Sequence, residues 1–187
     1  VLFRSACIRK RTGSGLLEYL SERVFRKLGI DPDRLIWHRH ADGLENGSGG
    51  FVSTVRDNAL LMELYRCRGI WKGERLLSEE WVDFALQVQN THTGGEAAYG
   101  GLIWIREGCF VADGAMGQWA MLFPDKDMVV SIQQTIASPE VDAQVRKAVV
   151  ELVAKAQDTP VLWTGEESRA LEKRMRTLCI PAPAYGR

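Results

Sequence analysis

The amino-acid sequence predicts an α+β protein in which an antiparallel sheet is flanked by helices, with a helical lobe beside it. Three observations support this fold class. The first half of the chain carries apolar residues at helical spacing, with Gly or Pro where each periodic stretch stops. From Tyr99 to Ile132 the apolar residues fall in short runs between turn residues, as in consecutive antiparallel strands. A last helical stripe follows from Ser138, so a helix can lie across that sheet.

Two helices are expected before the first long loop. Residues 6–11 form the end of a helix that Thr12 and Gly13 break, and Ser14 stands where it can cap the next one. The second helix ends at Gly29. Its buried face carries apolar residues near every fourth position: Leu16, Leu17, Leu20, Val24 and Leu28.

Residues 37–53 show no period and are rich in glycine, so we expect a loop that is long enough to have a function. Thr54 and Asp57 have capping-box spacing at the start of a helix that Gly69 ends. Ser78 is placed to cap a shorter helix. The apolar side chains of that helix point one way: Trp81, Val82, Ala85 and Leu86.

Short apolar runs then predict four strands: Leu102–Ile105, Cys109–Ala112, Trp119–Phe123 and Met128–Ile132. Pro139 suits the first position of a following helix. Its apolar stripe is Val141, Val145, Ala148, Val149 and Leu152. A last amphipathic piece carries Leu171, Met175 and Leu178.

The net charge and the composition of the chain limit the classes of partner that it is expected to bind. Lys plus Arg and Asp plus Glu both number 24, so the sequence favours neither nucleic acid nor an anionic membrane as a partner. No apolar run approaches the roughly 18 residues that a membrane helix needs. His38, His40 and Asp42 are zinc-ligand types, but their loop lacks helical i, i+4 spacing and a third firm ligand. We therefore expect no metal and no cofactor.

Three segments resemble the β-lactamase and penicillin-binding-protein-like serine hydrolases, in their class C β-lactamase-like branch. Residues 6–30 are similar to the helix pair that follows the family's Tyr-x-Asn motif. Residues 71–82 are similar to its G-x-W-x-G-x-x-L-L-x-x-x-W-V stretch. Residues 112–118, Ala-Asp-Gly-Ala-Met-Gly-Gln, followed by Pro124, resemble the family's third motif on its inner strand. The resemblance covers nearly the whole chain and implies a partial domain of the β-lactamase/transpeptidase-like fold.

The family's chemistry uses residues that this chain lacks. In the family, a Ser of an S-x-x-K motif attacks a carbonyl, the Lys and a Tyr move the proton, and a backbone N–H on the third-motif strand helps to bind the oxyanion. The sequence holds neither S-x-x-K nor Y-x-N in the right context. The resemblance therefore implies the C-terminal portion of a serine hydrolase that acts on an ester or amide, with its nucleophile upstream, and we expect this chain alone to be inactive. The alternative is a non-catalytic ligand-binding or sensor protein that keeps the fold.

The third motif is the part of the site that can be carried over. Alignment on Gln118 and Pro124 puts Ala115 where many relatives have Lys or His, and implies its backbone N–H as the oxyanion donor. The expected substrate-binding residues are Asp113, Gly114, Met116 and Gly117, together with Gly49 and Gly50 of the glycine-rich loop. Without a Lys or His to hold a substrate carboxylate, esterase or peptidase activity is expected rather than hydrolysis of penicillin-like substrates.

The same residues have a plainer interpretation when they are taken without the resemblance. They predict a tight hairpin in which Gly114 and Gly117 permit the turn. Asp113 would then either contact a substrate or hold the turn through an Asx-type bond.

The domain boundaries follow from the resemblance. Residues 6–156 would be the C-terminal part of the serine hydrolase domain, and residues 157–187 a helical extension and linker. Residues 1–5 are what GTG CTC TTC CGA TCT would encode, a string that resembles a widely used sequencing adapter, so we expect a non-native leader. Natural residues of a truncated helix are the alternative. The expected partner is a small-molecule or peptide substrate, while the oligomeric state and the compartment, bacterial cytoplasm or periplasm, stay open.

Overall fold

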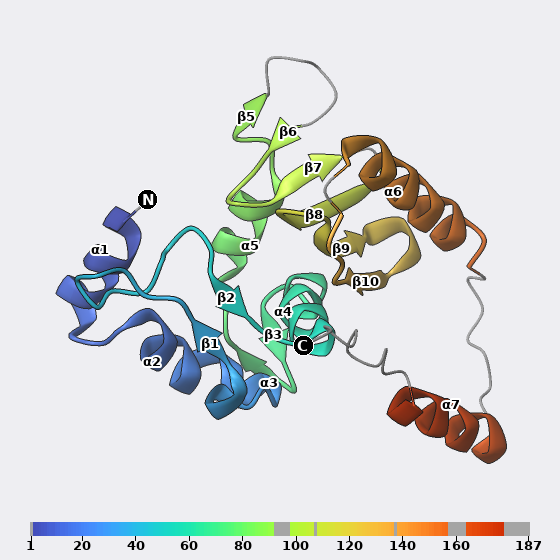
Figure 1. The fold of residues 1–187 in the computed structure, drawn as a ribbon, viewed down its shortest axis with the longest axis horizontal. Coiled ribbons are helices and arrows are strands. Elements are labelled where there is room, and N and C mark those ends of the chain that lie inside the picture. Colours follow the sequence, from blue (N-terminus) through green and yellow to red (C-terminus); the bar gives the residue numbers. More distant parts are fainter. Residues whose placement is uncertain (1, 92–97, 107, 137, 157–163, 178–187) are drawn as a thin grey trace, which may run out of the picture. The chain divides into compact units, whose positions relative to one another are not determined.

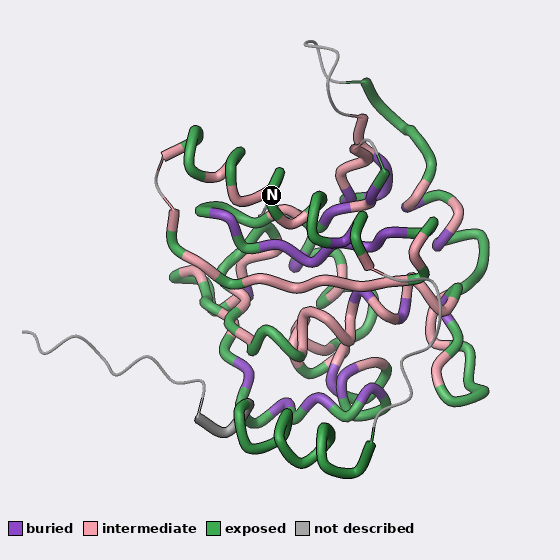
Figure 2. Tube along the Cα trace, turned by 90° about the vertical axis from the view of Figure 1, so that its right-hand side faces the viewer, coloured by how far each residue is buried: buried purple, intermediate pink, exposed green. Residues whose placement is uncertain are grey.

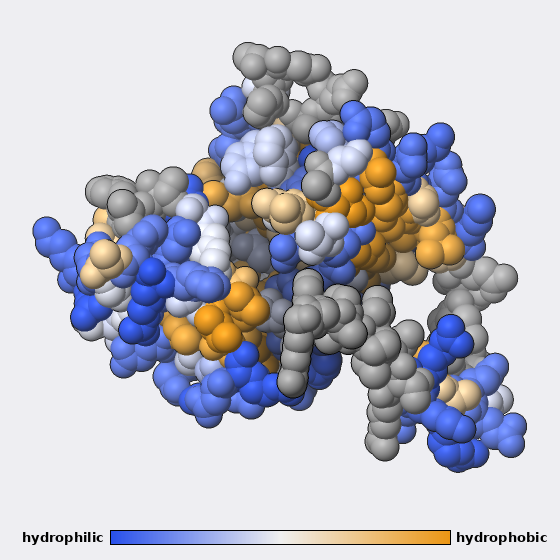
Figure 3. Space-filling model, in the orientation of Figure 1, coloured by the Kyte–Doolittle hydropathy of each residue, from blue (hydrophilic) through white to orange (hydrophobic). Residues whose placement is uncertain are grey.

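The computed structural model describes residues 2–91, 98–106, 108–136, 138–156 and 164–177. Residue contacts divide the chain into two compact units, residues 1–154 and residues 155–187. The first unit contains a helical lobe and a sheet (Figure 1). The second unit contains α7 (Gly165–Thr177), whose surface is mostly hydrophilic (Figure 3). Leu171 is half-exposed on α7, while Leu178 of the predicted apolar face lies outside the described residues.

The helical lobe begins with α1 (Leu2–Thr12) and α2 (Leu16–Leu20). The chain continues through a π-helical stretch, η1 (Ser21–Phe25), into α3 (Arg26–Leu28). Gly29 ends it as predicted, with a φ of 77° that a side chain would disfavour. Leu28 of the predicted apolar face lies in a buried cluster with Phe25, Ile30, Leu35 and Leu64. Leu17, Leu20 and Val24 are partly buried and pack against this cluster.

The predicted cap of α2 is wrong. Gly15, not Ser14, is the N-cap residue, and no side chain at that position caps the helix. Instead, Glu45 accepts a hydrogen bond from the Leu16 N–H at 3.2 Å. The cap thus comes from a distant loop and not from the local sequence.

The predicted loop of residues 37–53 is partly paired. It follows a 3-10 turn, η2 (Pro32–Arg34), and two short strands, β1 (Ile36–Trp37) and β2 (Phe51–Val52), pair antiparallel. Arg39 and Glu45 form a further antiparallel bridge inside it. The glycine-rich stretch is therefore an excursion from a small ribbon.

The capped helices are confirmed. Thr54 and Asp57 form the complete capping box at the start of α4 (Val55–Arg66). The hairpin β3 (Ile70–Trp71) and β4 (Glu74–Arg75) follows. Ser78 then caps α5 (Glu79–Leu86) by accepting from the Trp81 N–H. Val82 and Ala85 are fully buried, while Trp81 remains 38% exposed.

A six-stranded antiparallel meander forms the sheet, with neighbours in the order β10-β9-β8-β7-β6-β5. A 3-10 turn, η3 (Pro124–Lys126), joins the last two strands. The four predicted strands are present, and two short strands that the sequence did not reveal extend the edge. The bounds are β5 (Asn90–Thr91), β6 (Ala98–Tyr99), β7 (Trp104–Arg106), β8 (Cys109–Gly114), β9 (Gln118–Phe123) and β10 (Met128–Ile132).

Helices cover both faces of the sheet, and β9 is buried from Trp119 to Phe123 (Figure 2). Cys109, Val111 and Met121 face α6 (Pro139–Ala154), whereas Phe110, Ala120 and Leu122 lie in the cluster that includes α4 side chains. This alternation is the period-two pattern of strands. The third-motif hairpin between β8 and β9 is therefore held between two helices.

The phase of the α6 stripe differs from the predicted one. Val145, Val149 and Val153 pack on the sheet, whereas Val141 is 44% and Leu152 71% exposed. The apolar stripe predicted for α6 was broader than the helix face that the sheet can cover. Within the described residues, no helix has both the length and the hydropathy to cross a membrane.

Candidate active site

The third motif forms the turn of the β8–β9 hairpin. The ladder ends at the Gly114–Gln118 pair, so Ala115, Met116 and Gly117 make the turn. Met116 (φ 64°) and Gly117 (φ 80°) have left-handed backbone, whereas Gly114 does not. The hairpin interpretation thus holds, with Gly117 rather than Gly114 supplying the left-handed conformation.

Ala115 is exposed at this turn, outside the ladder. Its N–H makes no hydrogen bond to any other described residue. A backbone donor that the sheet does not use is what an oxyanion site requires. The oxyanion role of Ala115 stays a prediction.

The first of two adjoining cavities, about 510 Å³ in volume, lies beside the hairpin. Ala112, Asp113 and Gly114 border it from β8, and Gly47 and Ser48 border it from the glycine-rich loop. α4 closes another side with Leu61, Met62 and Tyr65. The hairpin and the loop, far apart in the sequence, therefore share one cavity.

The second cavity, also about 510 Å³, shares Asn58 and Gln118 with the first. It is bordered by Gly50 of the loop, by Phe51 and Val52 of β2, and by polar side chains. These are His38, Ser53, Asn58, Gln118, Gln133, Gln134 and Thr135. No Lys, Arg, Asp or Glu lies among its described lining residues.

The predicted substrate-binding residues divide between these cavities. Asp113 and Gly114 border the first, and Gly50 borders the second. Gly49, Ala115, Met116 and Gly117 border neither. Asn58 and Gln118, at the junction of the two, were not predicted, because a polar residue in a capped helix or at a strand end is typical of ordinary surface.

The Asp113 side chain takes a role that neither sequence interpretation included. Its Oδ2 accepts hydrogen bonds from Arg106 at 2.9 Å and from Arg146 of α6 at 3.1 Å. Asp113 lies on the same face of β8 as Cys109 and Val111, which pack toward α6. The carboxylate therefore ties the strand to two arginines, in place of the expected Asx-type bond.

No protein-family model and no curated protein sequence matches the chain. Among solved structures, a protein assigned as a 6-aminohexanoate-dimer hydrolase from Bacillus anthracis matches 80% of this chain with a TM-score of 0.71 and 23% identity. A penicillin binding protein from Bacillus halodurans matches 78% of it with a TM-score of 0.56 and 17% identity.

The chain has the β-lactamase/transpeptidase-like fold. It spans 40% of the length of the first of these proteins and 53% of the second. At these identities the similarity shows the fold, as the resemblance of the third motif had implied.

Tyr65 is a titratable group on the wall of the first cavity in this β-lactamase-like unit. Burial raises the pKa of its hydroxyl above the ordinary value, and the hydrogen bond that Trp81 Nε1 donates to it at 3.2 Å lowers the pKa by less. The hydroxyl is therefore protonated at neutral pH. It can donate a hydrogen bond there but is poorly suited to act as a base.

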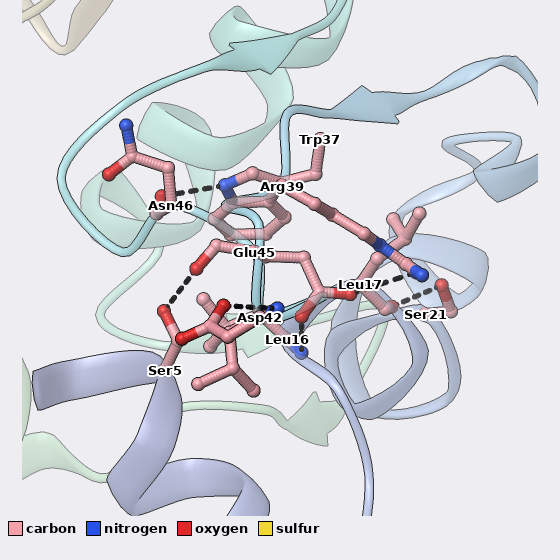
Figure 4. A network of polar contacts seen from close by, with 10 residues as sticks. Ser5, Leu16, Leu17, Ser21, Trp37, Arg39, Asp42, Glu45 and Asn46 are labelled. Atoms are coloured by element: carbon pink, nitrogen blue, oxygen red, sulfur yellow. Dashed lines mark hydrogen bonds and ion pairs between the residues drawn. The ribbon is translucent and has the colours of Figure 1, made fainter. Parts of the chain in front are cut away.

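Glu45 fixes the glycine-rich loop that borders the same cavity (Figure 4). Only 2% of Glu45 is exposed. Its carboxylate accepts from the Leu16 N–H and, at 3.1 Å, from Arg39. Its carbonyl accepts from the Ser5 hydroxyl, and Trp37 Nε1 donates to the Asn46 carbonyl at 2.9 Å. These bonds fix the chain immediately before Gly47 and Ser48.

Ser5 of the expected leader is buried in this network. A Cβ on Gly47 would lie 2.8 Å from the Ser5 hydroxyl, so α1 and the loop are in close contact. The non-native origin of residues 1–5 stays a prediction.

Proposed function

We propose that this chain is the C-terminal part of a serine hydrolase that cleaves an ester or amide through an acyl-enzyme, with its nucleophile upstream. The observation that carries the proposal is the third-motif hairpin, which borders a cavity shared with the glycine-rich loop in a β-lactamase/transpeptidase-like fold. The upstream serine would attack the carbonyl carbon, and the carbonyl oxygen would become an oxyanion. Departure of the leaving group would then give the acyl-enzyme, which water hydrolyses.

Ala115 is the proposed backbone donor to that oxyanion. Preorganised N–H groups stabilise the charge that develops in the transition state, and the Ala115 N–H is not used by any described residue. Gly114, which precedes it and borders the cavity, is the next donor to test.

The second cavity favours a substrate that is uncharged on that side. Its carboxamide, hydroxyl and imidazole groups can donate to and accept from an amide or ester. A substrate carboxylate would find no Lys or Arg among the described lining residues to pair with it. On the side of the second cavity, esterase or peptidase activity on neutral substrates therefore fits better than cleavage of penicillin-like compounds, whereas the first cavity has one cation, Arg4, among its described lining residues.

Covalent labelling tests the proposal. The full-length protein encoded at the genomic locus should react once with a fluorophosphonate probe, at the Ser of an S-x-x-K motif upstream of residue 6, as mapped by mass spectrometry. The 187-residue chain serves as the control and should stay unlabelled. A full-length protein that has no S-x-x-K and does not react would refute the hydrolase proposal.

A non-catalytic binding or sensor protein is the second candidate. Such a protein would bind neutral amides or esters and release them unchanged, so the same labelling experiment separates the two candidates.

A further inference from the structure

Helix α6 contacts the third-motif hairpin through one arginine. Arg146 donates to Asp113, the second-last residue of β8, at 3.1 Å. Its guanidinium carbon lies 4.5 Å from the centre of the Trp119 ring, at the start of β9. A single side chain thus contacts the strand on each side of the Ala115–Gly117 turn.

The Arg146 contacts are largely shielded from solvent. The side chains of Arg146 and Asp113 are 19% and 18% exposed, and Asp142, which accepts from Arg146 at 2.8 Å, is 23% exposed. Charge-assisted hydrogen bonds are stronger and more specific in direction when water is partly excluded. The planar guanidinium can therefore hold its partners in a defined geometry.

The middle of the turn is held from the same side. A Cβ on Gly117 would lie 2.9 Å from Asp142 Oδ1, so the Arg146-bound carboxylate packs against the turn. The Ile136 N–H, in the segment that leads to α6, donates to the Met116 carbonyl at 3.0 Å. Met116 has a left-handed backbone, a conformation that persists when surrounding contacts enforce it.

We propose that Arg146 is a positioning residue that fixes the third-motif turn and thereby the direction in which the Ala115 N–H points. It touches no substrate and acts through Asp113, Trp119 and Asp142. The inference rests on the proposed function, in which that N–H binds the oxyanion. A donor misplaced by about 1 Å can cost up to roughly 100-fold in rate. Contacts that hold the turn rigid should therefore raise kcat.

A merely structural role would make Arg146 equivalent to Arg66. Arg66 also joins a helix to a turn of the same sheet, from α4 to Asp127 at 2.6 Å, with a second bond to Glu63. It lies among the contacts of the β9–β10 turn, away from the third motif. Arg66→Met is therefore the matched control for Arg146→Met. In Arg146→Met, Asp113 keeps its bond to Arg106, which favours folding of the variant.

The first experiment uses the 187-residue chain and measures amide hydrogen exchange at Ile136, whose bond to Met116 reports on the turn. Arg146→Met should accelerate this exchange by about tenfold or more. Arg146→Lys keeps the charge but not the planar guanidinium, so its exchange rate at Ile136 should lie between those of Arg146→Met and the original protein. Arg66→Met should leave the rate at Ile136 unchanged.

The second experiment uses the full-length enzyme and separates kcat from KM. Arg146→Met should lower kcat by about 10- to 100-fold with little change in KM, and Arg146→Lys should restore part of the loss. Arg66→Met is the control for a general loss of stability. It should keep its kcat even if its melting temperature falls as far as that of Arg146→Met. Should Arg146→Met fail to fold, Arg146→Lys carries the comparison.

The outcomes separate this inference from the proposed function. Unchanged Ile136 exchange in Arg146→Met, or an equal loss of kcat in Arg66→Met, would overturn the positioning role. An enzyme that loses activity in Ala115→Pro but not in Arg146→Met keeps the proposed function and rejects the inference. A full-length protein without activity rejects the proposed function and with it the catalytic role of Arg146.

Discussion

The carboxylate of Glu45 accepts a hydrogen bond from the backbone N–H of Leu16, although 29 positions separate the two residues. A helix N-terminus leaves N–H groups without partners inside the helix, and a local side chain usually supplies the acceptor. In this chain the loop that borders the candidate site supplies it. The stability of α2 and the position of the loop are therefore coupled.

Glu45→Ala should lower the free energy of unfolding by about 2–3 kcal/mol, because it leaves a part-buried N–H unpaired and removes the partner of Arg39. Glu45→Gln keeps a carbonyl acceptor and should cost less. Urea denaturation measures both. Glu74→Ala, which breaks an exposed pair with Lys27, is the control and should cost less than about 1 kcal/mol. Equal losses in Glu45→Ala and Glu74→Ala would contradict the coupling.

The turn of the third motif should respond oppositely at its two left-handed positions. Met116→Gly relieves a left-handed conformation at an exposed side chain and should stabilise the protein by about 0.5–1 kcal/mol. Gly117→Ala imposes that strain and places a Cβ against Gln134 Nε2, the nearest atom, and 2.9 Å from Asp142 Oδ1, so it should cost about 2 kcal/mol or more. Melting curves of the two variants decide, and a stabilising Gly117→Ala would show that the turn relaxes freely.

The Ala115 donor is tested by proline in the full-length enzyme. Ala115→Pro deletes the N–H with little added bulk and should lower kcat by about 10²- to 10³-fold. Ala115→Ser keeps the N–H and should keep most of the activity. Both proteins must first be shown to be folded by circular dichroism. Near-normal kcat in folded Ala115→Pro would make the assignment wrong, with Gly114 and Met116 as the next donors to examine.

The 187-residue chain alone should give no burst of product with a chromogenic ester or a chromogenic cephalosporin. The physical reason is that a burst needs an activated serine, and this sequence contains no S-x-x-K motif. Stopped-flow absorbance at stoichiometric enzyme checks this expectation. A burst abolished by fluorophosphonate would show that a serine within these residues is the nucleophile.

Local chemistry is what the sequence by itself determined. The capping box of Thr54 and Asp57, the Ser78 cap and the stop at Gly29 are set by residues within one helical turn of each other, and all three are confirmed. Short apolar runs between turn residues likewise predicted β7 to β10. The third motif could be recognised because the run of residues 112–118 and the spacing to Pro124 are read directly from the sequence.

Only the tertiary structure decided the contacts between distant segments. The cap of α2 by Glu45, the phase of the α6 stripe and the bonds from Arg146 to Asp113 each depend on which segments meet in space. The side-chain periodicity of α6 allowed more than one face to be buried, and the surface of β8 and β9 selected the face with Val145, Val149 and Val153. Asp113 has the right residue type for a turn bond, but two arginines brought by β7 and α6 bind its carboxylate. An Arg–carboxylate bond carries charge on both donor and acceptor, whereas an Asx-type bond carries it on the acceptor alone.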